Sequence, residues 1–299
     1  MMNLAEYRNS ATCLADFLPW AALVAPGVVL NKDGSFQRTA RFRGPDLDSA
    51  VPAELVGVAG RLNNVLRRLG SGWALFVEAQ RLPASIYPES RLPDAASALV
   101  DAERKAAFEE QGTHYESAYY LTFLYLPPAW ESGGVERFLY EGRNRSAGAD
   151  AREILAGFTD RTDRVLQLLE GFMPECHWLD DAETLTYLHS CISTRRQRVR
   201  VPEVPMYLDG LLADQPLTGG LEPKLGDCHL RVLTIVGFPG TTTPGLLDEL
   251  NRLAFAYRWS TRAILLDKTD ATRLLTRIRR QWFAKRKSIA AILKEVMTN

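Results

Sequence analysis

Hydrophobic and polar positions change their period twice in the first third of the chain. Residues 24–30 and 35–43 have the pattern of two strands, and the NKDG turn at 31–34 joins them because Asp-Gly supplies the positive φ angles of a tight hairpin. Apolar residues then recur every three or four positions over 55–69, which predicts a helix with one buried face. The mostly apolar stretch 73–79 completes a predicted β-β-α-β unit.

The middle of the chain is predicted to be rich in helices. Helical spacing covers 94–110 and 151–172, and an aromatic, β-branched stretch at 114–126 predicts a long strand between them. A further helix is expected after Asp180, because Glu183 stands at the capping-box spacing of three residues.

The last third alternates between predicted strands and helices. Strands are expected at 229–238 and 261–266, and Thr243-Pro244 has the signature of a helix start between them. We expect that helix to bury the following side chains: Leu247, Leu250, Ala254 and Tyr257. One uninterrupted helix is predicted over 270–297, with a length of roughly 40 Å.

These elements predict a mixed α/β fold of the α+β class, in which small sheets are covered by helices. A polar, glycine-rich segment at 131–150 separates two stretches that are each long enough for a core. We therefore predict an N-terminal β-β-α-β subdomain with a following helix and strand at 1–130, a flexible linker at 131–150, and a second α/β subdomain at 151–299 that ends in a long basic amphipathic helix.

Composition places the chain among ordinary globular proteins. Its 299 residues include 36 Lys and Arg against 36 Asp and Glu, so the formal net charge is zero and a protein that is basic over its whole surface is excluded. The four cysteines show no disulfide-framework spacing, which favours reduced thiols in the cytosol. The start lacks the order of a signal peptide, and the uncharged stretch 18–30 is too short to cross a bilayer.

A glycine-rich stretch at 237–245 lies between a predicted strand and a predicted helix, which is where a phosphate-binding loop would lie. It contains no lysine, and Pro239 and Pro244 remove two amide donors. A nucleotide-binding P-loop needs Lys followed by Ser or Thr, and no stretch of the chain fits that pattern. The segment is therefore interpreted as a capped strand-to-helix turn, and ATP hydrolysis by this chain alone is not expected.

Cysteine and histidine are neighbours at three places, 176–177, 189–191 and 228–229. Structural zinc sites use ligand pairs two to four residues apart, so adjacent Cys-His pairs argue against a metal. His189 shares a helical face with Leu185 and Leu188, which favours a core position. Neither a metal site nor a catalytic Cys-His pair is expected.

The strongest signal outside the core is the charge of the last predicted helix. Arg273, Arg277, Arg280 and Lys287 share one side of a helical wheel, opposite an apolar side. A solvated face, an acidic partner, a phosphate backbone and the inner surface of a membrane are all compatible with it. The basic cluster at 195–200 has the same alternatives.

Four runs of this sequence resemble the N-terminal part of TrbE-type conjugal transfer proteins, in the CagE/TrbE/VirB group of type IV secretion ATPases. The likeness extends over essentially the whole chain and does not depend on one short motif. The runs are LPWAALVAPGVVLNKDGSFQ at 18–37, DDAETLTYLH at 180–189, YRWSTR at 257–262 and QWFAKRK at 281–287.

The resemblance implies an inner-membrane-associated motor that is longer than this chain and carries a RecA-like ATPase domain after the region seen here. The family's Walker residues have no matching positions in this sequence. ATP and Mg²⁺ are therefore implied only for that C-terminal domain, with no cofactor in this chain. Asn299 follows a predicted helix without a terminal cap, which suggests a fragment of a longer reading frame.

We accordingly expect an N-terminal docking and assembly region that links the motor to inner-membrane channel components, at the cytoplasmic face of the inner membrane. The implied partners are those components, the family's own C-terminal ATPase domain and further copies of the chain, without specific nucleic-acid binding. A stand-alone nucleic-acid-binding or nucleotide-binding module is the alternative. The expected contact residues are Pro19, Trp20, Arg273, Arg277, Arg280 and Lys287, although Trp20 is equally compatible with the core.

Overall fold

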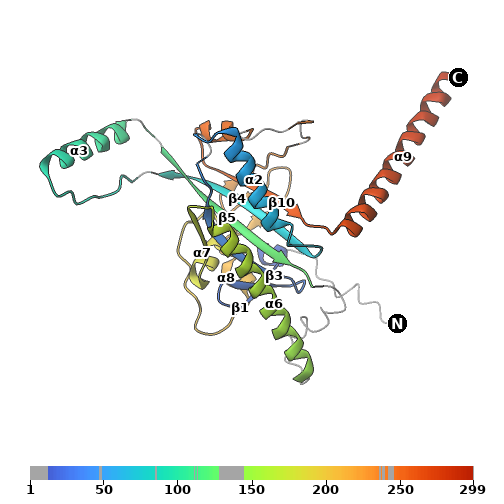
Figure 1. Cartoon of the computed structure of the whole chain (residues 1–299), viewed down its shortest axis with the longest axis horizontal. Helices are drawn as coiled ribbons and strands as arrows, with labels where there is room; N and C mark the ends of the chain where they lie inside the picture. Colours follow the sequence, from blue (N-terminus) through green and yellow to red (C-terminus); the bar gives the residue numbers. More distant parts are fainter. Residues whose placement is uncertain are drawn as a thin grey trace.

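The structure is a computed structural model in which an antiparallel sheet lies between two layers of helices (Figure 1). It describes residues 13–46, 49–84, 86–110, 112, 114–127, 145–235, 237, 240–241 and 246–298, without the side chains of 145–150, 248, 251 and 285–298. The predicted α+β class is confirmed.

The seven-stranded sheet has the order β1-β2-β3-β5-β4-β10, and β6 also pairs with β3. Every pairing is antiparallel. Its strands are β1 (Trp20–Ala25), β2 (Val28–Asn31), β3 (Phe36–Arg43), β4 (Trp73–Ala84), β5 (His114–Tyr125), β6 (Glu175–Trp178) and β10 (Tyr257–Ile264). A second, small sheet consists of β7 (Leu217–Thr218), β8 (Lys224–Leu225) and β9 (Cys228–His229).

Helices cover both faces of the large sheet and also extend away from it. The helices are α1 (Leu14–Phe17), α2 (Pro52–Leu66), α3 (Ala95–Glu110), α6 (Arg145–Glu170), α7 (Asp181–Ile192), α8 (Leu208–Leu212) and α9 (Lys268–Thr298), with a 3-10 helix η2 at Asp248–Arg252. α2 and α6 pack on one face, and α7 and α8 on the other. α3 and α9 project from the body at opposite ends of Figure 1.

Alternating side chains of β2 divide the core between the two faces. Val28 and Leu30 point into the cluster under α6, where Phe158 is 1% exposed and stacks on the ring of Phe36 at 5.7 Å between centroids. Val29 points the other way, into the cluster under α7 and α8. The period of two therefore gives each helix layer its own apolar surface.

The predicted strand at 24–30 is broken into two strands. Pro26 and Gly27 form a turn between β1 and β2, and Gly27 has a φ of 65°, which side chains with a Cβ rarely adopt. A Cβ there would lie 2.4 Å from the carbonyl oxygen of Leu179. The Gly27 N–H donates to Asp181 Oδ1 at 2.7 Å, so this turn also holds the start of α7.

Two other elements differ from the prediction. The strand expected at 229–238 is limited to β9, and residues 230–235 have no described strand partner. The helix expected to follow Thr243-Pro244 is reduced to η2, and Tyr257 belongs to β10 because it pairs with Arg81 of the sheet. The start of that helix at 243–244 lies outside the described residues.

Strands from both predicted subdomains share the large sheet. β6 pairs with β3, and β10 pairs with β4 over eight residues. The predicted linker at 131–150 lies outside the described residues except for its last portion, which forms the first turns of α6. The division into 1–130 and 151–299 stays a prediction.

Candidate interaction surface

α9 is attached to the edge of the sheet by a small group of polar contacts. The Ser71 hydroxyl donates to Asp270 Oδ2 at 2.5 Å and accepts from the Asp267 N–H at 3.0 Å. Just before the helix, the Leu265 N–H donates to the carbonyl of Trp73 at 2.9 Å. These contacts fix where α9 leaves the body.

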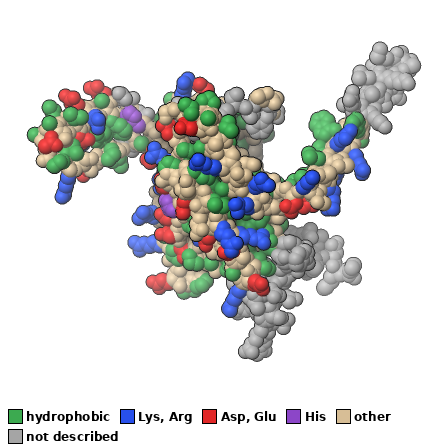
Figure 2. Space-filling view, in the orientation of Figure 1, with side chains coloured by type: hydrophobic (Ala, Val, Ile, Leu, Met, Phe, Trp, Pro, Cys, Tyr) green, Lys and Arg blue, Asp and Glu red, His purple; other side chains and the backbone are tan. Residues whose placement is uncertain are grey.

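The basic face of α9, defined here as Arg273, Arg277 and Arg280, is exposed to solvent. Arg273 Nη1 lies 3.5 Å from Asp270 Oδ1, whereas Arg277 and Arg280 have no acidic partner among the described side chains. Figure 2 shows blue side chains gathered along this helix. Lys287 belongs to α9, but its side chain lies outside the described portion. The structure therefore brings three of the four expected basic residues together on one projecting helix.

Pro19 and Trp20, the other two expected contact residues, do not lie beside α9. They stand at the start of β1, which is the first strand of the sheet, whereas α9 follows β10, the last strand. Trp20 is 7% exposed and packs in the cluster under α7 and α8, so the structure places it in the core. Pro19 is exposed, and its carbonyl accepts from the Lys32 N–H at 2.7 Å. No common surface with α9 results.

The sequence interpretation missed a polar cluster between β4, β10 and α7. Glu78 is buried, and its Oε1 accepts from Arg258 Nε at 2.5 Å and from Gln80 Nε2 at 2.7 Å. Its Oε2 accepts from the Tyr187 hydroxyl at 3.2 Å. Arg258 Nη1 also donates to the carbonyl of Ser190 at 2.7 Å. A carboxylate inside the apolar strand 73–79 was the available sequence signal for this cluster.

The chemistry of this cluster is that of a structural ion pair. Burial raises the pKa of the neighbouring Cys191 thiol to about 11, so it stays protonated at neutral pH although Arg258 Nη2 lies 3.5 Å from its Sγ. Burial also raises the pKa of Tyr187 well above its ordinary value. Reactive cysteines and general bases have pKa values nearer neutrality. The cluster therefore anchors β10 to the sheet and to α7.

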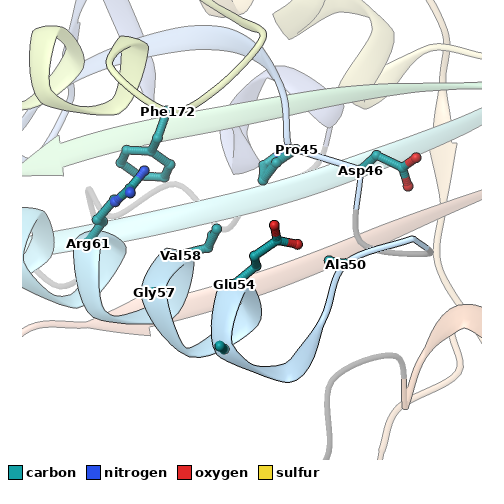
Figure 3. Close-up of a pocket in the computed structure, with 9 residues that line it drawn as sticks. Pro45, Asp46, Ala50, Glu54, Gly57, Val58, Arg61 and Phe172 are labelled. Carbon is teal, nitrogen blue, oxygen red and sulfur yellow. The ribbon is translucent and has the colours of Figure 1, made fainter.

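A hollow of about 530 Å³ lies beside the start of α2 (Figure 3). Its polar lining includes Asp46, Glu54 and Arg61, and Phe172 closes one side. Glu54 Oε2 accepts from the Val51 N–H at 3.1 Å, which is a helix-capping contact. This carboxylate therefore serves the backbone at the start of α2.

The other candidates from the sequence do not converge on a common site. His189 is 2% exposed, as expected for a core residue, and its Nε2 lies 3.2 Å from Asp214 Oδ2. Among the residues that the structure describes, no three His, Cys, Asp or Glu side chains are arranged to hold a metal ion. The basic cluster at 195–200 is an exposed loop, and most of the stretch 237–245 lies outside the described residues.

Comparison with known proteins identifies the family. Residues 27–132 match the family described as type IV secretion system ATPase VirB4/TrbE, N-terminal domain. A conjugal transfer protein TrbE of Rhizobium radiobacter is 34% identical over 301 residues, which cover 95% of this chain and 37% of that protein. The first piece of a probable conjugal transfer protein TrbE of Sinorhizobium fredii is 38% identical over 146 residues, which cover 48% of this chain and 98% of the relative. The chain belongs to the TrbE/VirB4 family.

More distant members of the TrbE/VirB4 family match over nearly the same length. The type IV secretion system protein virB4 of Brucella suis is 23% identical over 297 residues, which cover 91% of this chain and 35% of that protein. The chain thus spans little more than a third of the longer relatives. In the described residues, no helix has an apolar stretch long enough to cross a membrane.

Proposed function

We propose that this chain is the docking and assembly region of a TrbE-type conjugation ATPase, and that it attaches the motor to inner-membrane channel components. The observation that carries the proposal is the basic face of α9, which is exposed and has two arginines without an acidic partner among the described side chains. Such a face fits acidic protein surfaces and anionic lipid headgroups. The protein is then peripheral to the cytoplasmic face of the inner membrane.

The remaining aspects of the proposed function concern the whole protein. ATP hydrolysis with Mg²⁺ is assigned to residues outside this chain, because the sequence contains no G-x-x-x-x-G-K-[ST] segment. The family's ATPase domain and further copies of the protein are proposed as its other partners. No specific nucleic-acid binding is proposed, since the net charge of the chain is zero.

Charge reversal of the basic face tests the docking role. A Lys or Arg near an anionic surface contributes about 1 kcal/mol, so reversing the three arginines of the basic face together with Lys287 is expected to weaken membrane association about a thousandfold. Association is measured by co-sedimentation with anionic vesicles and by recovery in membrane fractions from cells with and without the transfer system. The four substitutions are Arg273→Glu, Arg277→Glu, Arg280→Glu and Lys287→Glu.

A control variant reverses four exposed arginines on α2, on the turn after it and on α6. It carries Arg61→Glu, Arg67→Glu, Arg68→Glu and Arg152→Glu and is expected to keep its membrane association. If the α9 variant loses membrane recovery only in cells with the transfer system, its basic face binds a channel component. If the α9 variant also loses binding to vesicles, the face binds lipid. Unchanged recovery of the α9 variant in both assays would contradict the docking role.

A further inference from the structure

α3 forms the tip of an arm that extends beyond the sheet. β4 and β5 pair from Trp73↔Tyr125 to Ala84↔His114, but β3 pairs with β5 only from Tyr119 onward and β10 pairs with β4 only as far as Arg81. Beyond Arg81 and Ser117 the ribbon is therefore two strands wide, and it carries α3 (Figure 1). No residue of α3 is buried. A two-stranded ribbon with one uncovered helix is marginally stable in water, so this arm needs a partner.

One side of α3 contacts other residues of the same arm. The ring of Phe108 stacks on His114 with centroids 3.8 Å apart, and Asp101 Oδ1 accepts from the Tyr87 hydroxyl at 2.7 Å. Leu99 lies nine positions from Phe108, which is half a turn around the helix, and it is 64% exposed. Leu99 therefore lies on the side of α3 that faces away from its own arm, and it is open to solvent there.

The exposed sides of α3 and α9 have the same spacing. On α3, Leu99 continues at steps of three and four residues to Ala102 and Ala106. On α9, Leu275, Ile278 and Trp282 follow the same steps, and Leu275 and Trp282 are 65% and 71% exposed. Apolar residues at alternating steps of three and four form the seam along which two helices pack.

The opposite net charges of α3 and α9 favour contact between these two helices and disfavour contact between two copies of the same helix. α3 has four acidic and two basic residues, a net charge of −2, and Glu103 and Glu110 flank its apolar side. The stretch 268–284 of α9 has five basic residues and one acidic residue, a net charge of +4, and Arg279 flanks its apolar side. Figure 2 shows mostly red and green side chains, with a few blue ones, on the arm of α3, and mostly blue and green side chains along α9. Two α9 helices would place like charges along one seam.

The two helices of one chain cannot reach each other. α9 starts three residues after Leu265, whose N–H donates to the carbonyl of Trp73 at the first residue of β4, whereas α3 starts at Ala95, beyond the last residue of that strand, Ala84. A strand of 12 residues separates them by about 40 Å. Ser71 holds the start of α9 to the body. The partner helix must come from another molecule.

We propose that α3 of one copy packs along the apolar side of α9 of the next copy, so that the chain assembles head to tail. This inference rests on the self-association named in the proposed function and assigns a surface to it. Because each copy presents two different surfaces, the contact is heterologous and repeats until a ring closes or a filament forms.

The test uses two single variants of the 299-residue chain, Leu99→Asp and Trp282→Asp, with the exposed Val56→Asp on α2 as control. Sedimentation velocity of the wild type is expected to show association that grows with concentration and weakens with salt. Each variant is expected to raise the concentration needed for association about a hundredfold, because an aspartate would be buried in the seam. The control is expected to behave as wild type, and circular dichroism checks that all three variants are folded.

Mixing the two variants gives the decisive result. The Leu99→Asp copy keeps an intact α9, and the Trp282→Asp copy keeps an intact α3, so the mixture is expected to form dimers and to stop there. A wild type that remains monomeric, a mixture that does not associate, or loss of association in Trp282→Asp alone would each overturn the proposal. The last result would assign α9 to another occupant, such as a second α9. Membrane association is a separate readout, so the docking role can fail or hold independently.

Discussion

Ionisable side chains that lie inside the molecule are held by defined partners. Glu78 is buried, and its carboxylate accepts hydrogen bonds from three side chains. Arg258 supplies the opposite charge, and Gln80 and the Tyr187 hydroxyl are neutral donors. Such a pair adds little net stability compared with apolar residues, but the loss of one partner is costly. Its position joins β4 to β10, and β10 leads directly into α9.

Buried thiols make the free energy of unfolding depend on pH in the alkaline range. Burial raises the pKa of Cys176 to about 11, above the ordinary value of 9.0. The unfolded thiol therefore ionises first as the pH rises, and the free energy of unfolding is expected to fall between pH 9 and 11 by about 2 to 3 kcal/mol for this group. Urea unfolding across this range should show a smaller fall for Cys176→Ala. Cys228→Ala, at an exposed position, should leave the fall unchanged.

Helices are predicted most accurately where the same segment has both a capping signal and an apolar face that the tertiary structure buries. Asp180 Oδ1 accepts from the Glu183 N–H at 2.7 Å, and Glu183 Oε2 accepts from the Asp180 N–H at 3.0 Å, which is the predicted capping box of α7. The same helix buries Leu185 and Leu188 under the sheet. The helix expected after Thr243-Pro244 lacks this agreement, because the sheet takes Tyr257 into β10.

Removal of the α7 cap is expected to weaken the fold measurably. Asp180→Ala leaves the Glu183 N–H without its side-chain acceptor and should lower the free energy of unfolding by about 1 kcal/mol. Chemical denaturation measures the change, and Glu153→Ala on the exposed side of α6 is the matched control. An Asp180→Ala variant as stable as the control would mean that tertiary packing alone holds this end of α7.

At the scale of the whole molecule, two helices extend away from the body into solvent. α3 and α9 both project from it with exposed apolar side chains, among them Leu99, Leu275 and Trp282. A molecule of this shape is suited to assembly with other molecules.

Separate expression of the two predicted subdomains tests how far they are independent. Because β6 and β10 pair with β3 and β4, we expect residues 1–130 and 131–299 to fold only when they are produced together. Co-purification of the two pieces, with native-like circular dichroism, would measure this. A second piece that stops at residue 256 lacks β10 and is expected to associate poorly. Two pieces that each fold alone as stable monomers would instead support independent subdomains.

The sequence alone determined the local features of this protein. The NKDG hairpin, the cap at Asp180, the strands of the β-β-α-β unit and the amphipathic α9 all follow from contacts between residues close in the chain. Only the tertiary structure decided what lies side by side. It placed Trp20 in the core, paired β10 with β4 and put α3 and α9 at opposite ends of one strand. Strand pairing joins residues far apart in sequence, and periodicity describes which face of an element is buried but not which element covers it.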